Sequence, residues 1–186
     1  MTVLDRLRGE AGGAAGEYAR LVAAGTDELA DALTSGALPL WARELAAYRL
    51  GLAGDRRAFE ALVLLLNHRD PPRCAAAAEA LAALGDPRTA RAAAALATNE
   101  LRVAYALEPV RLLVALRAPE SVPALMTTLD RRLTPHDPYG RVALACVEGL
   151  GALGDGRARA LLVRAQSHPR LAVVATDALK ALASAR

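Results

Sequence analysis

The sequence has few aromatic residues and no long apolar run, and each shortage excludes a class of protein. Aromatics make up 3% of the 186 residues although 54% are hydrophobic, so a core must be built from Ala, Leu and Val. Ala and Leu favour helices, and β-branched residues are too scattered for a sheet. No apolar run approaches the ~18 residues of a membrane span, so we expect no membrane association. The charged amino terminus does not resemble a signal peptide, which predicts a cytoplasmic protein.

The cysteines, histidines and charges indicate no chemical site. Cys74 and Cys146 lie in apolar helical segments outside any CxxC or Cys/His pattern, so we interpret them as core residues. His68 and His168 fall in distant turns and are expected to be solvated. The 23 Lys and Arg residues are interleaved with 20 Asp and Glu residues, whereas a nucleic-acid surface needs clustered basic residues. We expect no metal, cofactor or catalytic group, and do not favour a nucleic-acid partner.

One phrase, CAAAAEALAALGDPRTA, begins at Cys74 and recurs with variations along the chain. In it, one helix ends before Gly85 and the next begins at Asp86, which is followed by proline. Asp accepts hydrogen bonds from the amides of a first turn, and Pro fits the first helical position. Asp55 and Asp155 stand at similar places, so we interpret these aspartates as helix caps rather than as a row of catalytic carboxylates.

These glycine and aspartate signals at helix ends and starts predict five helical hairpins. Aligned by their apolar ends, the second helices place a leucine in one column at steps of 31, 32, 37 and 29 residues: Leu50, Leu81, Leu113, Leu150 and Leu179. Such a period indicates stacked helical pairs, none of which can bury its apolar face alone. We expect residues 1–25 to form capping helices joined by a flexible Gly/Ala stretch, and residues 26–186 to form the repeat array.

Two features interrupt the repeat. Pro109 lies inside an expected helix over residues 100–116, and we expect it to kink that helix rather than split it. The stretch TPHDP enlarges the turn before the fourth returning helix. Its His136 and Asp137 are either a functional loop or a tolerated surface insertion.

The phrase LGDPR and the arginine that begins the partner helix in PPRCAAAAEAL, YGRVALACVEGL and HPRLAVVATDAL carry a family resemblance. The chain resembles bacterial HEAT-like repeats, and is most similar to those first named from phycobilin lyases, over about residues 26–184. The resemblance implies an all-α fold, a right-handed α-α superhelix (HEAT-like solenoid). It also implies that Arg73, Arg141 and Arg170 pair with aspartates of neighbouring hairpins; a phosphate-binding ridge is the alternative.

In such arrays the second helix of each hairpin usually lines the concave side. The column two residues before the leucines contains Tyr48, Glu79, Arg111, Glu148 and Asp177. We favour Trp41, Tyr48 and Arg49 as the binding surface, since these residue types are enriched among interface anchors; alternatively, Trp41 covers the core at the end of the stack. The whole set of predicted partner-binding residues is Trp41, Tyr48, Arg49, Tyr105, Glu108, Arg111 and Glu148.

The leading hypothesis is a non-enzymatic scaffold that binds another protein or peptide on its concave face. Glu148 and Asp177 would repel a phosphate backbone, which favours a protein partner. One alternative is a lyase-like enzyme or accessory that holds a small ligand or carrier near Tyr105, Glu108 and Arg111. Another is a DNA-binding HEAT-like protein. The oligomeric state stays open, since an uncovered apolar end would favour self-association.

Overall fold

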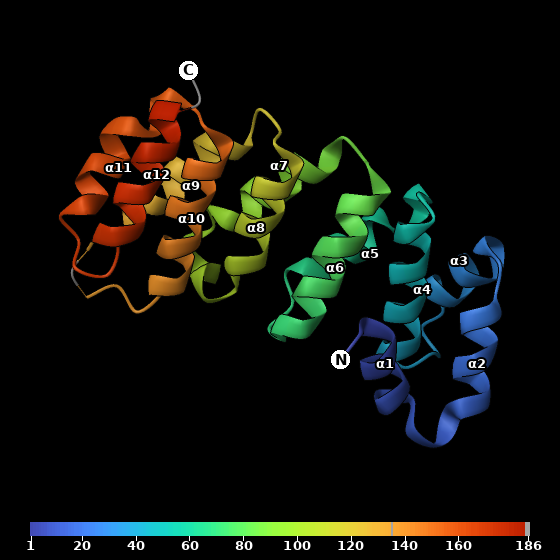
Figure 1. Cartoon of the computed structure of the whole chain (residues 1–186). Coiled ribbons are helices and arrows are strands. Elements are labelled where there is room, and N and C mark those ends of the chain that lie inside the picture. Colours follow the sequence, from blue (N-terminus) through green and yellow to red (C-terminus); the bar gives the residue numbers. More distant parts are fainter. Residues whose placement is uncertain (135, 185–186) are drawn as a thin grey trace. The chain divides into compact units, whose positions relative to one another are not determined.

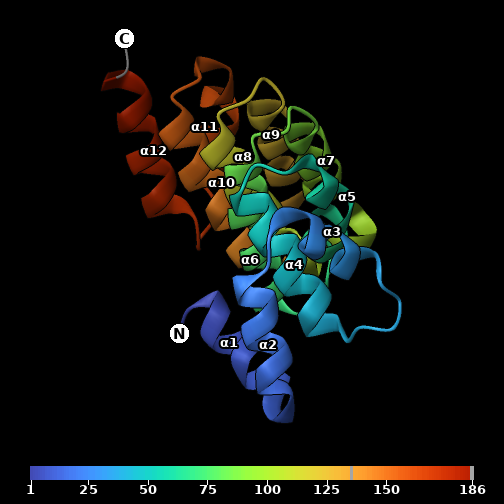
Figure 2. The ribbon, with the colours of Figure 1, turned by 90° about the vertical axis from the view of Figure 1, so that its right-hand side faces the viewer.

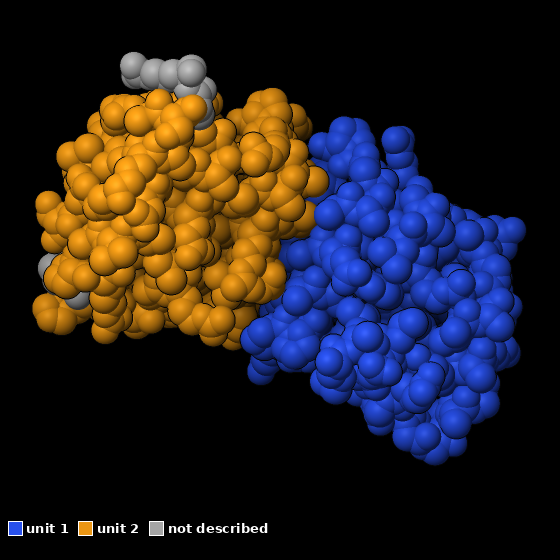
Figure 3. Space-filling model, in the orientation of Figure 1, with its two compact units in different colours: residues 1–89 blue, residues 90–186 orange. Residues whose placement is uncertain are grey.

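A computed structural model describes residues 1–134 and 136–184, and every regular element within these ranges is helical (Figure 1). The expected all-α stack of helices is confirmed. Pro135 of the TPHDP turn and the last two residues of the expected array lie outside the described residues. The chain divides into two compact units, unit 1 (Met1–Thr89) and unit 2 (Ala90–Arg186) (Figure 3). The N-terminal helices belong to unit 1, and their role as a cap stays a prediction.

Unit 1 is a stack built around one central helix, α4. Its elements are α1 (Val3–Ala11), the short 3-10 helix η1 (Gly12–Ala14), α2 (Ala15–Ala23), α3 (Thr26–Thr34), α4 (Leu40–Leu52), η2 (Arg56–Ala58), α5 (Phe59–Leu66) and α6 (Pro71–Leu84). Helix α4 contacts α1, α2, α3, α5 and α6. The expected flexible Gly/Ala joint is thus a single 3-10 turn between two packed helices.

Unit 2 continues the hairpin pattern in two layers. Its elements are the greater part of α7 (Arg88–Ala97), η3 (Glu100–Tyr105), α8 (Leu107–Leu116), α9 (Ser121–Arg132), α10 (Gly140–Leu153), η4 (Gly156–Ala158), α11 (Arg159–Gln166) and α12 (Ala172–Ser184). The second helices α8, α10 and α12 form one layer, and α9 and α11 lie in the other (Figure 2). Helix α9 packs on α8 and α10, and α11 packs on α12, so each contact joins near neighbours in the chain, as a repeat stack requires.

The predicted capping aspartates close the turns between hairpins. Asp55 and Asp155 accept the backbone N–H two residues on, at 3.0 and 2.9 Å, and Asp86 does the same at 2.9 Å. Each also accepts the guanidinium of that same residue, which is arginine in all three turns. The motif Asp-x-Arg therefore satisfies one first-turn amide in each turn and holds the arginine in one place.

Pro109 splits the expected helix instead of kinking it, so the prediction of a kink is wrong. Arg102 within η3 has non-helical angles (φ −129°, ψ 21°), and α8 begins only at Leu107. Pro109 then lies in the first turn of α8, where an amide has no intrahelical acceptor and proline is tolerated. Starting the helix just before proline avoids the steric clash that a continuous helix would suffer.

The leucine column forms the core of the stack: Leu50, Leu81, Leu113 and Leu150 are fully buried, and Leu179 in the terminal helix is half-buried. Glycines beside this column allow the second helices to approach closely. A Cβ on Gly51 would lie 2.9 Å from Ala80 Cβ in unit 1, and a Cβ on Gly151 would lie 2.8 Å from Ala178 Cβ in unit 2. The same device therefore joins α4 to α6 and α10 to α12.

Within unit 2, the second helices lie closer together than the first helices do. Helix α10 contacts α8 and α12 directly. On the opposite side, open hollows separate α9 from α7 and from α11. A stack that is tight on one side and spread on the other bends toward the tight side. Helices α8, α10 and α12 therefore line the inner side of unit 2.

Candidate functional site

Two of the predicted binding residues in unit 1, Trp41 and Tyr48, lie in its core. Trp41 is 7% exposed, and its ring centroid lies 6.3 Å from that of Tyr18. Tyr48 is 8% exposed and donates its hydroxyl to Glu79 Oε1 at 2.9 Å. Burial, together with this carboxylate, raises the pKa of Tyr48 to about 12. These contacts support the alternative in which Trp41 covers the core, and a role for either ring in binding stays a prediction.

Arg49 is held by the end of a neighbouring helix. Its guanidinium donates to the carbonyls of Leu21 and Ala24 at 3.0 and 3.1 Å, and also to that of Val22. The last carbonyls of a helix lack intrahelical donors, so Arg49 satisfies the carboxyl end of α2. The side chain thus fastens α2 to α4, which leaves fewer of its donors for a partner.

Unit 1 also contains a buried charge network that the sequence analysis missed. Glu44 on α4 is 1% exposed and accepts hydrogen bonds from Arg6 on α1 and Arg73 on α6. Both arginines also bind Glu10, and Arg73 Nε lies 3.2 Å from Asp70. Burial acts to raise the pKa of Glu10, but hydrogen bonds from the two arginines outweigh it and lower that pKa. The network joins α1, α4 and α6.

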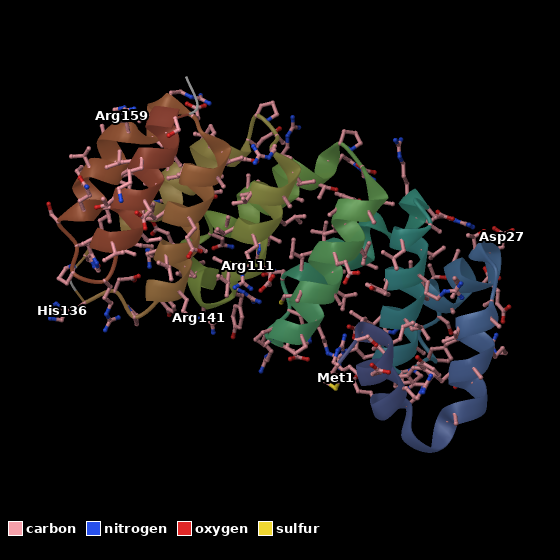
Figure 4. The ribbon with its side chains drawn as sticks, viewed as in Figure 1. Met1, Asp27, Arg111, His136, Arg141 and Arg159 are labelled. Carbon is pink, nitrogen blue, oxygen red and sulfur yellow. The ribbon has the colours of Figure 1, made fainter. Side chains whose placement is uncertain are left out.

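In unit 2, charged side chains gather on the exposed stripe of the second helices. We call this surface the second-helix face and define it by Glu108, Arg111, Arg141, Glu148 and Asp177. On α10 the exposed positions run through Arg141, Glu148 and Ala152, with half-buried Ala145 between the first two. This spacing of three or four residues keeps the side chains on one side of a helix. Figure 4 labels Arg111 and Arg141 on the neighbouring helices α8 and α10.

Helical phase explains why this stripe is exposed. Arg141 stands nine residues before the buried Leu150, about 180° away around a helix that turns by about 100° per residue. Arg73 stands only eight residues before Leu81, about 80° away, and therefore points toward the packed side of α6. A one-residue difference in spacing is the signal in the sequence that separates the two arginines.

The charges of the second-helix face differ in how they are paired. Glu108 accepts from Arg111 at 2.7 Å, and Asp177 accepts from Lys180 at 3.0 Å. Arg141 and Glu148 form no hydrogen bond or ion pair with any other described residue. Tyr105, nearby in the chain, is half-buried, with the Arg102 guanidinium 4.7 Å from its ring centroid. The face therefore combines internal ion pairs with one free cation and one free anion on α10.

The hollows in the outer layer of unit 2 are a second candidate site, which the sequence did not predict. One of about 580 Å³ lies between α7 and α9, and another of about 380 Å³ lies between α9 and α11. An ion pair of 2.6 Å between Asp130 and Arg164 crosses the second hollow. Both are open grooves between spread helices, and the first is lined mainly by small apolar residues such as Ala94 and Pro123.

His68, His168 and Cys146 have structural roles. His68 and His168 each accept a backbone N–H two residues on through Nδ1, at 3.0 and 3.3 Å, so they cap turns rather than being only solvated. Asp137 of the TPHDP turn binds Arg132 at 3.3 Å. Burial raises the pKa of the Cys146 thiol to about 12, which keeps it protonated and unreactive. Among residues 1–134 and 136–184, no cluster of three or more metal-ligating side chains occurs.

Comparison with known families places a repeat inside unit 2. Residues 142–168 match the family described as PBS lyase HEAT-like repeat. The match covers most of α10, the Asp155 turn and α11, one return helix with the first helix of the next hairpin. It confirms the resemblance that the recurring arginine and Gly-Asp phrases indicated. No curated protein matches the chain. Within the described ranges, no helix has both the length and the apolar character needed to cross a bilayer.

Proposed function

From the premise that this chain carries HEAT-like repeats of the PBS lyase type, we propose that it is a non-enzymatic, cytoplasmic scaffold that binds another protein or peptide. The observation that carries the proposal is the second-helix face of unit 2. It presents exposed charges of both signs, including Arg111, Arg141 and Glu148, from the neighbouring second helices α8 and α10 on the inner side of the unit.

The buried residues behind the second-helix face support a binding role. Leu113 and Leu150 lie directly behind it and are fully buried, so the helices that carry the charges are fixed by the core. A preorganised surface loses little conformational freedom when a partner binds. Charges of both signs favour a partner with complementary charges and disfavour a nucleic-acid backbone, whose phosphates would meet Glu148 and Asp177.

The groups whose pKa is shifted support a structural rather than catalytic use of charge. Hydrogen bonds from Arg57, Arg88 and Arg157 lower the pKa of the carboxylates that cap the corresponding turns: Asp55, Asp86 and Asp155. A carboxylate held in its charged form by an arginine and a backbone amide suits a cap better than an acid or base. Glu108, the acid considered for a lyase-like reaction, is paired with Arg111 on an exposed face.

Site-specific photo-crosslinking tests the proposal. A photoreactive benzoylphenylalanine is introduced at Ala152, which is exposed on α10, or at Ala160, which is exposed on α11 and lines the outer hollow. In native lysate we expect Ala152, but not Ala160, to give a discrete adduct with one partner, and Glu148→Arg to abolish that adduct. Adducts that form equally at both sites, only at Ala160, or not at all would overturn the proposal.

A further inference from the structure

Unit 1 shows what an arginine at the start of a second helix can bind. Arg73 begins α6 and is surrounded by carboxylates from three segments of the chain: Glu10, Glu44 and Asp70. Guanidinium and carboxylate groups match in geometry and form strong charge-assisted hydrogen bonds. The molecule therefore contains its own example of carboxylate recognition at this repeat position.

The corresponding arginines of unit 2 have no such carboxylate. Arg141 begins α10 and Arg170 precedes α12; both side chains are exposed, and neither forms an ion pair with another described residue. Arg170 Nη1 lies 3.5 Å from the place that a Cβ on Gly140 would take. Gly140 immediately precedes Arg141, so the Arg170 guanidinium lies against the turn of α10 from which Arg141 extends.

Asp137 and Glu148, which lie on either side of Arg141 in the chain, form no ion pair with these arginines. Asp137, in the preceding turn, has a side chain only 5% exposed and binds Arg132 at 3.3 Å. Glu148 lies on the same stripe of α10 as Arg141 but seven residues further along, about 10 Å at 1.5 Å per residue. The stripe of α10, together with Arg170 beside its first turn, therefore has a cationic end at Arg141 and Arg170 and an anionic end at Glu148.

We infer that this stripe binds an acidic segment of a partner protein, with the partner's carboxylates on Arg141 and Arg170 and a basic side chain on Glu148. The inference rests on the proposed scaffold function and adds the chemistry of the partner. Because an extended chain advances about 3.3 Å per residue, the basic residue and the acidic ones would be about three positions apart. A nucleic-acid strand fits less well, since its next phosphates would meet Glu148 and Asp177.

Fluorescence anisotropy with synthetic peptides tests this. The probe is a labelled peptide containing Glu-Glu-Ser-Ala-Arg within a Ser/Ala frame. One control peptide has both glutamates replaced by glutamine, and another has the same composition with arginine adjacent to the glutamates. A labelled oligothymidylate of similar length provides the nucleic-acid arm. We expect the probe to bind at least about tenfold more tightly than any of the other three ligands.

The matched variants locate the binding. Arg141→Gln with Arg170→Gln should weaken binding of the probe about tenfold or more, while Arg159→Gln, an exposed arginine on α11, should leave it unchanged. Glu148→Arg should restore affinity for a probe whose arginine is replaced by glutamate. Equal binding of the probe and its glutamine control, stronger binding of oligothymidylate, or an equal loss with Arg159→Gln would overturn the inference. If one of these results were obtained while a partner adduct formed at Ala152, the inference about the acidic segment would be wrong but the proposed scaffold function would still be supported.

Discussion

Units 1 and 2 use an arginine at the start of a second helix in opposite ways. In unit 1, Arg73 is enclosed by carboxylates and helps to join α1, α4 and α6. In unit 2, Arg141 is exposed and unpaired among the described residues. The two differ by one residue in their distance from the buried leucine of their helix, which rotates the side chain by about 100°. Repeat proteins can thus convert a stabilising charge into an available one without changing residue type.

The largest effect is expected from breaking the buried network of unit 1. Glu44→Gln leaves Arg6 and Arg73 with Glu10 as their main shared carboxylate, and we expect it to destabilise unit 1 by about 3 kcal/mol. Urea unfolding followed by fluorescence of Trp41 measures this, because the single tryptophan of the chain lies in unit 1.

Glu148→Gln is the matched control, since it removes an exposed carboxylate from the second helix of a unit 2 hairpin. Its effect on unfolding should stay within about 0.5 kcal/mol. If Glu44→Gln were equally mild, the buried network would contribute little to the stability of unit 1, and the contrast between the units would fail.

A smaller loss of stability is expected at the glycines that let second helices approach closely, a feature that both units share. Gly151→Ala places a Cβ 2.8 Å from Ala178 Cβ and 2.9 Å from Ala178 Cα, so the backbone of α12 must move. We expect a net loss of about 2 kcal/mol by thermal or urea unfolding followed by circular dichroism. Gly51→Ala, which meets Ala80 at 2.9 Å, should do the same in unit 1.

Gly9 on α1 provides the control for these substitutions, because nothing lies within 4 Å of a Cβ there. Gly9→Ala should be neutral or stabilise the protein by up to about 1 kcal/mol through helix propensity. Stabilisation by Gly151→Ala of the same size would show that close helix approach does not depend on glycine.

Lowering the pH should also destabilise the two units to different extents, and we expect this difference to be smaller than the effects of the substitutions above. Among the described residues, carboxylates with a lowered pKa are four in unit 1 (Asp5, Glu10, Asp55 and Asp86) and one in unit 2 (Asp155). A pKa that is lower in the folded state means stability that is present above the ordinary values of 4.5 for Glu and 3.8 for Asp and is lost as the pH falls through the folded values. Unit 1 should therefore unfold first.

Trp41 fluorescence and far-ultraviolet circular dichroism, recorded from pH 7 to pH 2, measure this difference. The fluorescence transition should fall at a higher pH than the overall loss of helix. Glu10→Gln removes one of the unit 1 carboxylates and should reduce the difference in pH between the fluorescence transition and the loss of helix. Coincident transitions would mean that the two units do not differ in their dependence on charged carboxylates.

The hairpins could be predicted because the residues that end one helix and begin the next act over a few positions in the sequence. The caps Asp55, Asp86 and Asp155 act on residues two positions away, so their role is legible in the sequence. The start of α8 was not predictable, because a proline in a first turn and a proline at a kink produce the same local pattern. Only the packing of residues 100–106 decides between them.

The exposure of the candidate binding residues was predictable in unit 2 and less so in unit 1. The repeat alignment places Tyr48 in the same column as Arg111 and Glu148, which are exposed. Tyr48 is buried because α1 and α2 pack on α4. An alignment of the repeats contains no information about these helices, which precede the first hairpin. The network around Glu44 was missed for the same reason, since its partners lie up to 63 residues apart in the chain.

The Asp-x-Arg turns determine where this chain can change length. Each closes over three residues, so inserting or removing a hairpin at the Asp155 turn of unit 2 would leave the hydrogen bonds of that turn intact. The amino-terminal third has no such freedom. Removing α1 would strand Glu44 and Arg73 without Arg6 and Glu10, so growth or loss of repeats is tolerated only beyond the segment that this early helix secures.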